Sequence, residues 1–111
     1  MTLPNGEQAI VPAGKVRNYL LSPHHLLGAH KAVVFARLGF RRRNWRDLRR
    51  ALKRIAMTGE ALHLGVTEYG QKFLIRGILR SAQGDSVAFV TIWMIPAGED
   101  TPRFVTAYPE T

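Results

Sequence analysis

The chain has 111 residues, 46% of them hydrophobic and none a cysteine, so it can form one modest core but no disulfide or thiolate metal site. Lysine and arginine outnumber aspartate and glutamate by 16 to 8, a formal net charge of +8, which points to a polyanionic partner. The N-terminal stretch lacks the basic-then-apolar order of a signal peptide, and no apolar run approaches the roughly 20 residues of a membrane-spanning helix. We therefore expect a single cytoplasmic domain over residues 1–111 with no membrane partner.

Two short helices are predicted first along the chain. Helical spacing of apolar residues predicts one over residues 15–21, with Tyr19 on its apolar stripe. The pattern over residues 28–38 predicts the second, and Gly39 is placed to cap its C-terminus.

The third predicted helix carries most of the charge. It opens at Asn44, with Asp47 three residues on in a capping arrangement, and ends near Gly59. The run Arg41 to Arg54 holds 8 of the 16 basic residues and one acid. The apolar stripe that should face the core consists of Trp45, Leu48, Leu52 and Ile55. The cations off this stripe and before it are candidate nucleic-acid contacts: Arg42, Arg43, Arg46, Arg49, Arg50 and Lys53.

From Ala61 onward the period of the apolar pattern drops to two. Four strands are predicted, over residues 61–70, 72–80, 86–95 and 103–108, with turn signals between them. Short connections imply antiparallel neighbours, and the third strand, apolar on both faces, should be central. These features predict an α+β domain in which N-terminal helices (about 1–59) pack on one face of a four-stranded antiparallel meander sheet (about 60–111).

The histidines form no recognisable metal-binding pattern. His24 and His25 are adjacent and His30 follows, which does not match HExxH spacing, and acids are scarce nearby. The motifs GxSxG, GxxxxGK[ST] and GxGxxG are absent. We therefore expect no metal and no cofactor, which leaves acid–base chemistry by side chains.

Cleavage of RNA suits this supply of side chains, because the RNA 2′-hydroxyl is itself the nucleophile. Imidazole can move the protons, a cation can hold the charged phosphorane, and hydroxyls can donate hydrogen bonds. The candidate catalytic residues are His25, with His30 as the alternative acid or base, Lys31, Arg103, Thr106 and Tyr108. Strand alternation is a difficulty, since it places Phe104, Thr106 and Tyr108 on one face and Arg103 on the other.

Simpler interpretations stay open. Histidines at the start of a helix are often solvated, an arginine run is often an exposed helix face, and Trp45 and Trp93 are expected to fill the core. The alternatives to an enzyme are a non-catalytic basic nucleic-acid-binding module and an interaction domain that docks on an acidic partner protein.

Motifs at both ends of the chain add a resemblance. The stretch LPNGEQAIVPAGKVRNYLLSPHHLLGAHKAVVFARLGF, followed later by TIWMI and PRFVTAYP, resembles a widespread uncharacterised bacterial domain family over nearly the whole chain. The residues that match its pattern are His25, Gly28, Lys31, Ala32, Phe35, Trp93, Arg103, Thr106 and Tyr108. Leu26 stands where that pattern has proline, so the turn after His25 is expected to differ.

The order of elements in that family is similar to the superfamily of small ribonuclease toxins that includes barnase, EndoU, colicin nucleases and the RelE type. This resemblance implies a metal-independent endoribonuclease that acts as the toxin of a bacterial toxin–antitoxin or contact-dependent competition system. The implied partners are transfer or messenger RNA and an acidic antitoxin or immunity protein. Because one fold hosts many functions, the site has to be judged on its own geometry.

Overall fold

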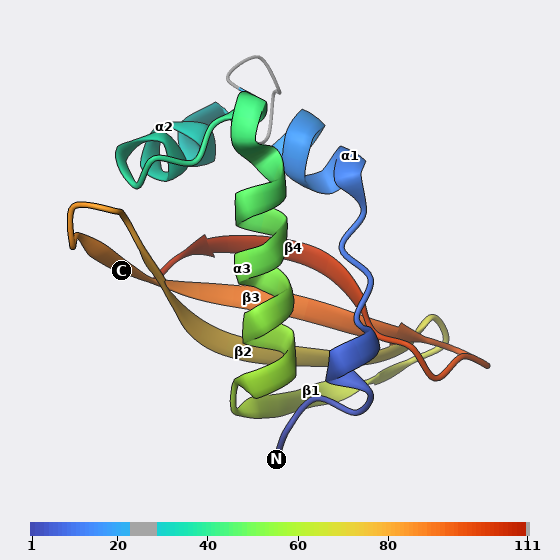
Figure 1. Cartoon of the computed structure of the whole chain (residues 1–111). Coiled ribbons are helices and arrows are strands. Elements are labelled where there is room, and N and C mark those ends of the chain that lie inside the picture. The colour runs from blue at the N-terminus through green and yellow to red at the C-terminus, as the bar shows by residue number, and fades with distance from the viewer. Residues whose placement is uncertain (23–28, 111) are drawn as a thin grey trace.

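The fold is built on a four-stranded sheet with helices on one side of it (Figure 1). The computed structural model describes residues 1–22 and 29–110. The helical segments are η1 (Gly6–Gln8), α1 (Ala13–Lys15), the π-helical turn η2 (Val16–Leu20), α2 (Ala29–Arg37), η3 (Arg42–Asn44) and α3 (Trp45–Thr58). The strands are β1 (Ala61–Thr67), β2 (Gly70–Arg80), β3 (Ser86–Pro96) and β4 (Arg103–Pro109). None of these described helices has the length and apolar character that a membrane crossing requires.

The strands lie in the order β1-β2-β3-β4, and each neighbouring pair is antiparallel. The predicted α+β class, helices followed by a meander, is therefore confirmed, and β3 lies inside the sheet as its apolar run predicts. α3 crosses one face of the sheet, and α1 and α2 lie near its start (Figure 1). The N-terminal segment joins the two sheet edges: the Ala61 amide donates to the Met1 carbonyl, and Ile10 bridges to Arg103 of β4.

The core lies between α3 and the sheet. The predicted stripe of α3 is buried there: Trp45, Leu48, Leu52 and Ile55 are each no more than 8% exposed. From the sheet, Trp93 is fully buried, and its ring meets Phe104 edge to face at 5.3 Å. Its indole Nε1 donates to Thr91 Oγ1 at 2.8 Å, and that hydroxyl donates to the Ile75 carbonyl at 2.7 Å, so these buried polar groups are satisfied.

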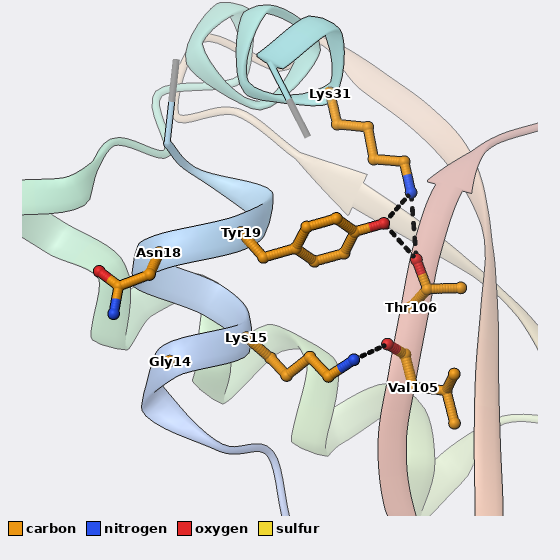
Figure 2. A pocket seen from close by; sticks show the side chains of 7 residues that line it. All are labelled: Gly14, Lys15, Asn18, Tyr19, Lys31, Val105 and Thr106. Atoms are coloured by element: carbon orange, nitrogen blue, oxygen red, sulfur yellow. Dashed lines mark hydrogen bonds between the residues drawn. The ribbon is translucent and has the colours of Figure 1, made fainter. Parts of the chain in front are cut away.

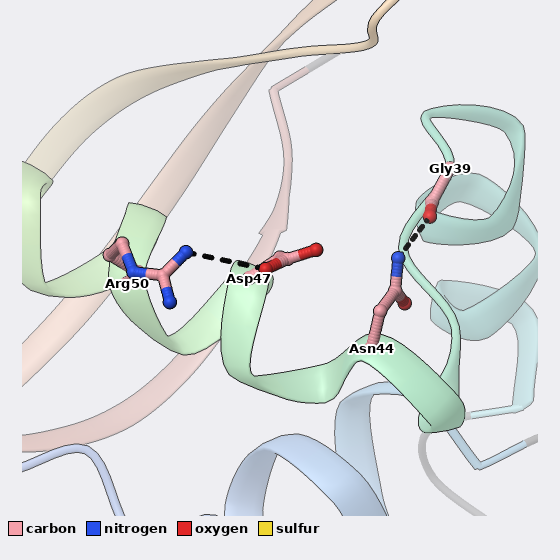
Figure 3. Close-up of polar contacts among 4 residues, drawn as sticks. All are labelled: Gly39, Asn44, Asp47 and Arg50. Atoms are coloured by element: carbon pink, nitrogen blue, oxygen red, sulfur yellow. Dashed lines mark hydrogen bonds and ion pairs between the residues drawn. The ribbon is translucent and has the colours of Figure 1, made fainter.

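Helix ends agree with the sequence at one point and depart from it at another. Gly39 follows α2 with a positive φ of 90°, as a C-terminal cap requires. The capping arrangement predicted for Asn44 and Asp47 is wrong (Figure 3). The Asn44 side chain instead accepts from the Arg41 amide at 2.7 Å and donates to the Gly39 carbonyl at 3.0 Å, while Asp47 pairs with Arg50 at 3.3 Å. Because η3 precedes α3, Asn44 closes the loop back toward α2.

The predicted alternation along β4 is also wrong. The pairing with β3 skips one residue between Phe104 and Thr106, which makes Val105 a β-bulge. Phe104 and Ala107 are consequently both buried although they lie three residues apart, and Thr106 and Tyr108 share the opposite face. A period of two holds only while the ladder is regular. The expected alternation was therefore wrong for Phe104, which does not share a face with Thr106, and for Arg103, which does.

The hairpin between β1 and β2 is tighter than the sequence indicates. β1 ends at Thr67, and Gly70 already begins β2. Gly70 has a φ of 141°, and a Cβ there would lie 2.1 Å from the Ile95 carbonyl oxygen of the next strand. Only glycine fits this position, because a side chain there would clash with the neighbouring strand.

Candidate active site

A hollow of about 760 Å³ opens where η2, α2 and β4 meet (Figure 2). Its lining residues are far apart in the sequence: Gly14, Lys15, Asn18, Tyr19, Lys31, Val105 and Thr106. We call this the Lys31 hollow. Two ammonium groups and two hydroxyls supply its chemistry, and none of these seven lining residues is acidic.

Lys31 is at the centre of the hydrogen bonds in the Lys31 hollow. Its Nζ donates to the Tyr19 hydroxyl at 2.8 Å and to Thr106 Oγ1 at 3.1 Å, and the two hydroxyl oxygens lie 3.2 Å apart. The ammonium also lies 4.9 Å from the centre of the Tyr19 ring. A cation held in this way can meet negative charge that develops in a substrate without first rearranging.

These neighbours change the pKa of the Tyr19 hydroxyl. Burial alone would raise the pKa of Tyr19, but hydrogen bonds with Lys31 and Thr106 and the charges of Lys31 and Lys15 outweigh it. The pKa of Tyr19 therefore lies below that of an ordinary tyrosine. Its phenolate is available at a lower pH than that of a free tyrosine, as a general base requires.

Two local features place these groups together. Lys15 and Tyr19 are four residues apart on the continuous turn of α1 and η2, and both side chains extend toward β4 (Figure 2). Lys15 Nζ donates at 3.1 Å to the carbonyl of Val105, the residue inserted by the bulge. β4 is an edge strand, so its outer backbone groups are accessible to side chains. The bulge thus fixes the position of η2 against the strand that carries Thr106.

The structure brings together only part of the predicted catalytic set. Lys31 and Thr106 meet in the Lys31 hollow, as predicted. Arg103 and Tyr108 are not among its lining residues. Arg103 is exposed at the first residue of β4, and Tyr108, 40% exposed, lies two residues beyond Thr106. The register puts both side chains on the same face of β4 as Thr106, but neither of them lines the Lys31 hollow.

The predicted histidines cannot be placed in the same way. His24, His25, Leu26 and Gly28 lie outside the described residues, so the roles proposed for them stay predictions. His30 belongs to α2, and its side chain is outside the described set. Across residues 1–22 and 29–110, no three His, Asp or Glu side chains converge as they would around a metal ion.

Sequence reasoning missed Tyr19 and Lys15 as site residues. The helical spacing of Tyr19 predicts a core position, and its ring does pack partly against the core. Its hydroxyl bonds to Lys31 in the Lys31 hollow. The available signal was the i, i+4 spacing of Lys15 and Tyr19, which places a cation and a phenol on one helical face.

The predicted nucleic-acid contacts lie on and before the exposed side of α3. Four of them line a second hollow of about 270 Å³, and we call these the α3 basic face: Arg46, Arg49, Arg50 and Lys53. Arg42 and Arg43 are exposed in η3. Arg42 donates to Asn18 Oδ1 at 3.1 Å, and Asn18 also lines the Lys31 hollow. A direct contact therefore connects the basic segment with the candidate site.

Comparison with known proteins places this architecture in a family. Residues 2–111 match the sequence profile of a domain of unknown function, DUF6883. The chain belongs to this family. No curated protein matches the DUF6883 chain.

The fold of the DUF6883 chain also occurs in a solved structure. It is similar to a chain of the contact-dependent growth inhibition toxin–immunity protein complex from Klebsiella pneumoniae 342. The TM-score is 0.72, the match covers 91% of this chain and 99% of that chain, and 17% of the residues are identical. At this identity the likeness concerns the fold.

Proposed function

We propose that this DUF6883 domain is a metal-independent endoribonuclease and that the Lys31 hollow is its active site. The observation that carries the proposal is the Lys31 ammonium, held between the hydroxyls of Tyr19 and Thr106 in a hollow whose lining includes no acid. Fixed positive charge beside hydroxyl donors stabilises an anionic transition state. The net charge of +8 favours a polyanionic substrate.

In the proposed reaction, the Tyr19 phenolate takes the proton of an RNA 2′-hydroxyl, and the 2′-oxygen attacks the adjacent phosphorus. The Lys31 ammonium and the Thr106 hydroxyl stabilise the negative charge of the phosphorane. The bond from phosphorus to the 5′-oxygen then breaks, and that oxygen takes a proton from a general acid, for which His25 is the candidate from the sequence. The products are a 2′,3′-cyclic phosphate and a 5′-hydroxyl end.

Two further residues keep a proposed role outside the chemical step. Arg103 and Tyr108 flank Thr106 along β4, and we assign them contacts with the nucleotides on either side of the cleaved bond. A guanidinium suits phosphate, and a phenol ring suits stacking on a base.

The biological role that fits this chemistry is that of a toxin. The solved structure with a similar fold contains a toxin and an immunity protein, and either role is compatible with a shared fold. An immunity protein that covers a cation-lined site needs an acidic surface, whereas this chain carries +8. We therefore propose a toxin that acts on transfer or messenger RNA in the cytoplasm, with an acidic antitoxin or immunity protein as its partner.

The direct test is incubation of the purified protein with total RNA in EDTA. We expect fragments that end in 2′,3′-cyclic phosphate, because the proposed reaction uses no metal. End-group analysis by mass spectrometry measures this outcome. If the protein binds RNA without cleaving it, a non-catalytic nucleic-acid-binding module describes it better. If EDTA stops the cleavage of RNA, the metal-independent mechanism is wrong.

The role of Tyr19 predicts a particular pH dependence. Because Tyr19 must be ionised and the general acid must still carry its proton, the wild-type rate should rise with pH as the Tyr19 phenolate forms and fall again as the general acid is deprotonated. Tyr19→Phe should lower kcat by about 100-fold and remove this rise, since the general base is lost. Single-turnover rates across a pH series measure both effects.

Tyr108→Phe is the matched comparison for that experiment. It removes a phenol from the same neighbourhood but from a side chain that does not line the Lys31 hollow. We expect its effect on kcat to stay below about tenfold. If the rise of the cleavage rate with pH persisted in Tyr19→Phe and disappeared in Tyr108→Phe, Tyr108 would be the general base.

A further inference from the structure

The α3 basic face lies outside the Lys31 hollow and has no part in the chemical step. We propose that it is a second binding site, for the phosphate backbone of RNA, and that the substrate is an RNA long enough to occupy both sites. This inference rests on the proposed ribonuclease function and adds the substrate class: an extended or folded RNA, in contrast to a short oligonucleotide.

The spacing of the cations supports a backbone ligand. Arg46, Arg50 and Lys53 are exposed and follow one another at i, i+4 and i+7, so they form one row along α3. At 1.5 Å per residue the row is about 10 Å long. Phosphates of one strand in a B-form duplex are spaced roughly 3.4 Å along the axis, so a row of this length spans about three phosphate-to-phosphate steps. Among the described residues of α3, Asp47 is the only acid, and it pairs with Arg50 of the row.

Arg49 and Trp45 make this surface more than a solvated helix face. The guanidinium of Arg49 lies 5.9 Å from the Trp45 ring centre and that of Arg46 lies 4.5 Å from it, so the indole holds both groups in place. Arg49 Nε is buried and has no hydrogen-bond partner in the described part of the chain. The exposed guanidinium of Arg46, held by the same indole, offers donors suited to phosphate oxygens.

The chemistry of the α3 basic face favours phosphate over an acidic protein. All four residues that line its hollow are cations, with no apolar side chain among them. The centres of protein–protein interfaces are depleted in charged residues and rich in apolar ones. Phosphate contacts need only charge and donors, and arginine and lysine supply most of them in nucleic-acid complexes.

The path between the two sites is short and basic. Arg42 of η3, just before α3, reaches Asn18 at the border of the Lys31 hollow. Arg17 of η2 is next to Asn18 in the sequence, and its guanidinium lies 5.7 Å from the Trp45 ring centre. An RNA backbone that leaves the Lys31 hollow over η2 would therefore meet positive charge until it reaches α3.

The test is a binding measurement with a long, fluorescein-labelled 2′-O-methyl RNA, which lacks the nucleophile and cannot be cleaved. The variant Arg46→Gln/Arg50→Gln/Lys53→Gln removes the exposed row while glutamine keeps a similar helix propensity. We expect its Kd to rise at least about tenfold near 0.1 M salt, and the slope of log K against log salt to become shallower by about 2. Circular dichroism checks that α3 is intact.

The matched control removes three exposed cations elsewhere, in Arg37→Gln/Lys72→Gln/Arg80→Gln. It has the same net charge as the α3 variant, so equal losses of affinity would show that only net charge matters and would overturn the proposal. Competition by poly-glutamate as effective as competition by RNA would also overturn it, since the surface would then fit an acidic protein equally well.

Cleavage assays separate this proposal from the proposed function. The α3 variant should cleave a dinucleotide at the wild-type rate and a long RNA with a KM raised about tenfold, because only the long chain reaches α3. Equal effects on both substrates would contradict a separate backbone site. If no RNA is cleaved by either protein, the ribonuclease function fails, while the binding result still decides whether α3 holds an RNA backbone.

Discussion

Replacing Lys31 with methionine is expected to lower RNA cleavage by about 10²–10³-fold, the usual cost of losing one donor to a transition-state oxyanion. Lys31 Nζ touches both hydroxyls of the site, so its loss removes the charge for the phosphorane and the group that lowers the pKa of Tyr19. Steady-state rates with a fluorogenic RNA measure the effect. Expression of the wild-type chain alone should also arrest growth, and Lys31→Met should relieve it.

Two controls make the Lys31 prediction specific. Methionine keeps most of the length of the lysine stem, so the free energy of unfolding should change by no more than about 1 kcal/mol. Lys31→Arg keeps the charge and should retain more activity than Lys31→Met. A Lys31→Met protein with activity within tenfold of wild type would show that the Lys31 hollow is not the active site.

Replacing Trp93 with alanine is expected to lower the free energy of unfolding by about 3–5 kcal/mol, enough to unfold much of a marginally stable domain. The indole is fully buried, packs on Phe104, and satisfies the buried Thr91 hydroxyl at 2.8 Å. Truncation leaves a large cavity and removes that hydrogen bond. Urea denaturation followed by circular dichroism measures the change.

Tyr69→Ala provides the comparison for Trp93. Tyr69 is also aromatic and lies in the sheet half of the chain, but it is 70% exposed. Its removal should change the free energy of unfolding by less than about 0.5 kcal/mol. A Trp93→Ala protein as stable as Tyr69→Ala would contradict the core described above.

Much of the fold could be predicted because the decisive signals are local. The change of apolar period near Ala61 separates helices from strands, and the stripe through Leu48 and Leu52 places α3 on the sheet. The errors occurred where hydrogen bonds or a bulge departed from the regular helix and strand patterns. Asn44 looks like a helix cap but bonds to the preceding loop, and Val105 looks like a regular strand residue but forms a bulge.

The candidate site was less predictable, because it depends on which side chains the fold brings together. Lys31 and Thr106 were predicted from residue chemistry, and they do meet. Tyr19 was assigned to the core, since periodicity describes where a ring packs and gives no information on where its hydroxyl points. Arg103 and Tyr108 share a strand with Thr106, but they do not line the Lys31 hollow.

Composition and short-range pattern thus determine that the chain is basic, that helices precede a meander sheet, and that α3 exposes a row of cations. These properties follow from residues within a few positions of one another, where helix and strand periods apply. Only the tertiary structure decides the site. Lys31 and Thr106 are 75 residues apart, and Tyr19 and Thr106 are 87 apart. Their hydrogen bonds form because the core packs α2 and η2 against the bulged edge strand, and no local period encodes a contact of that range.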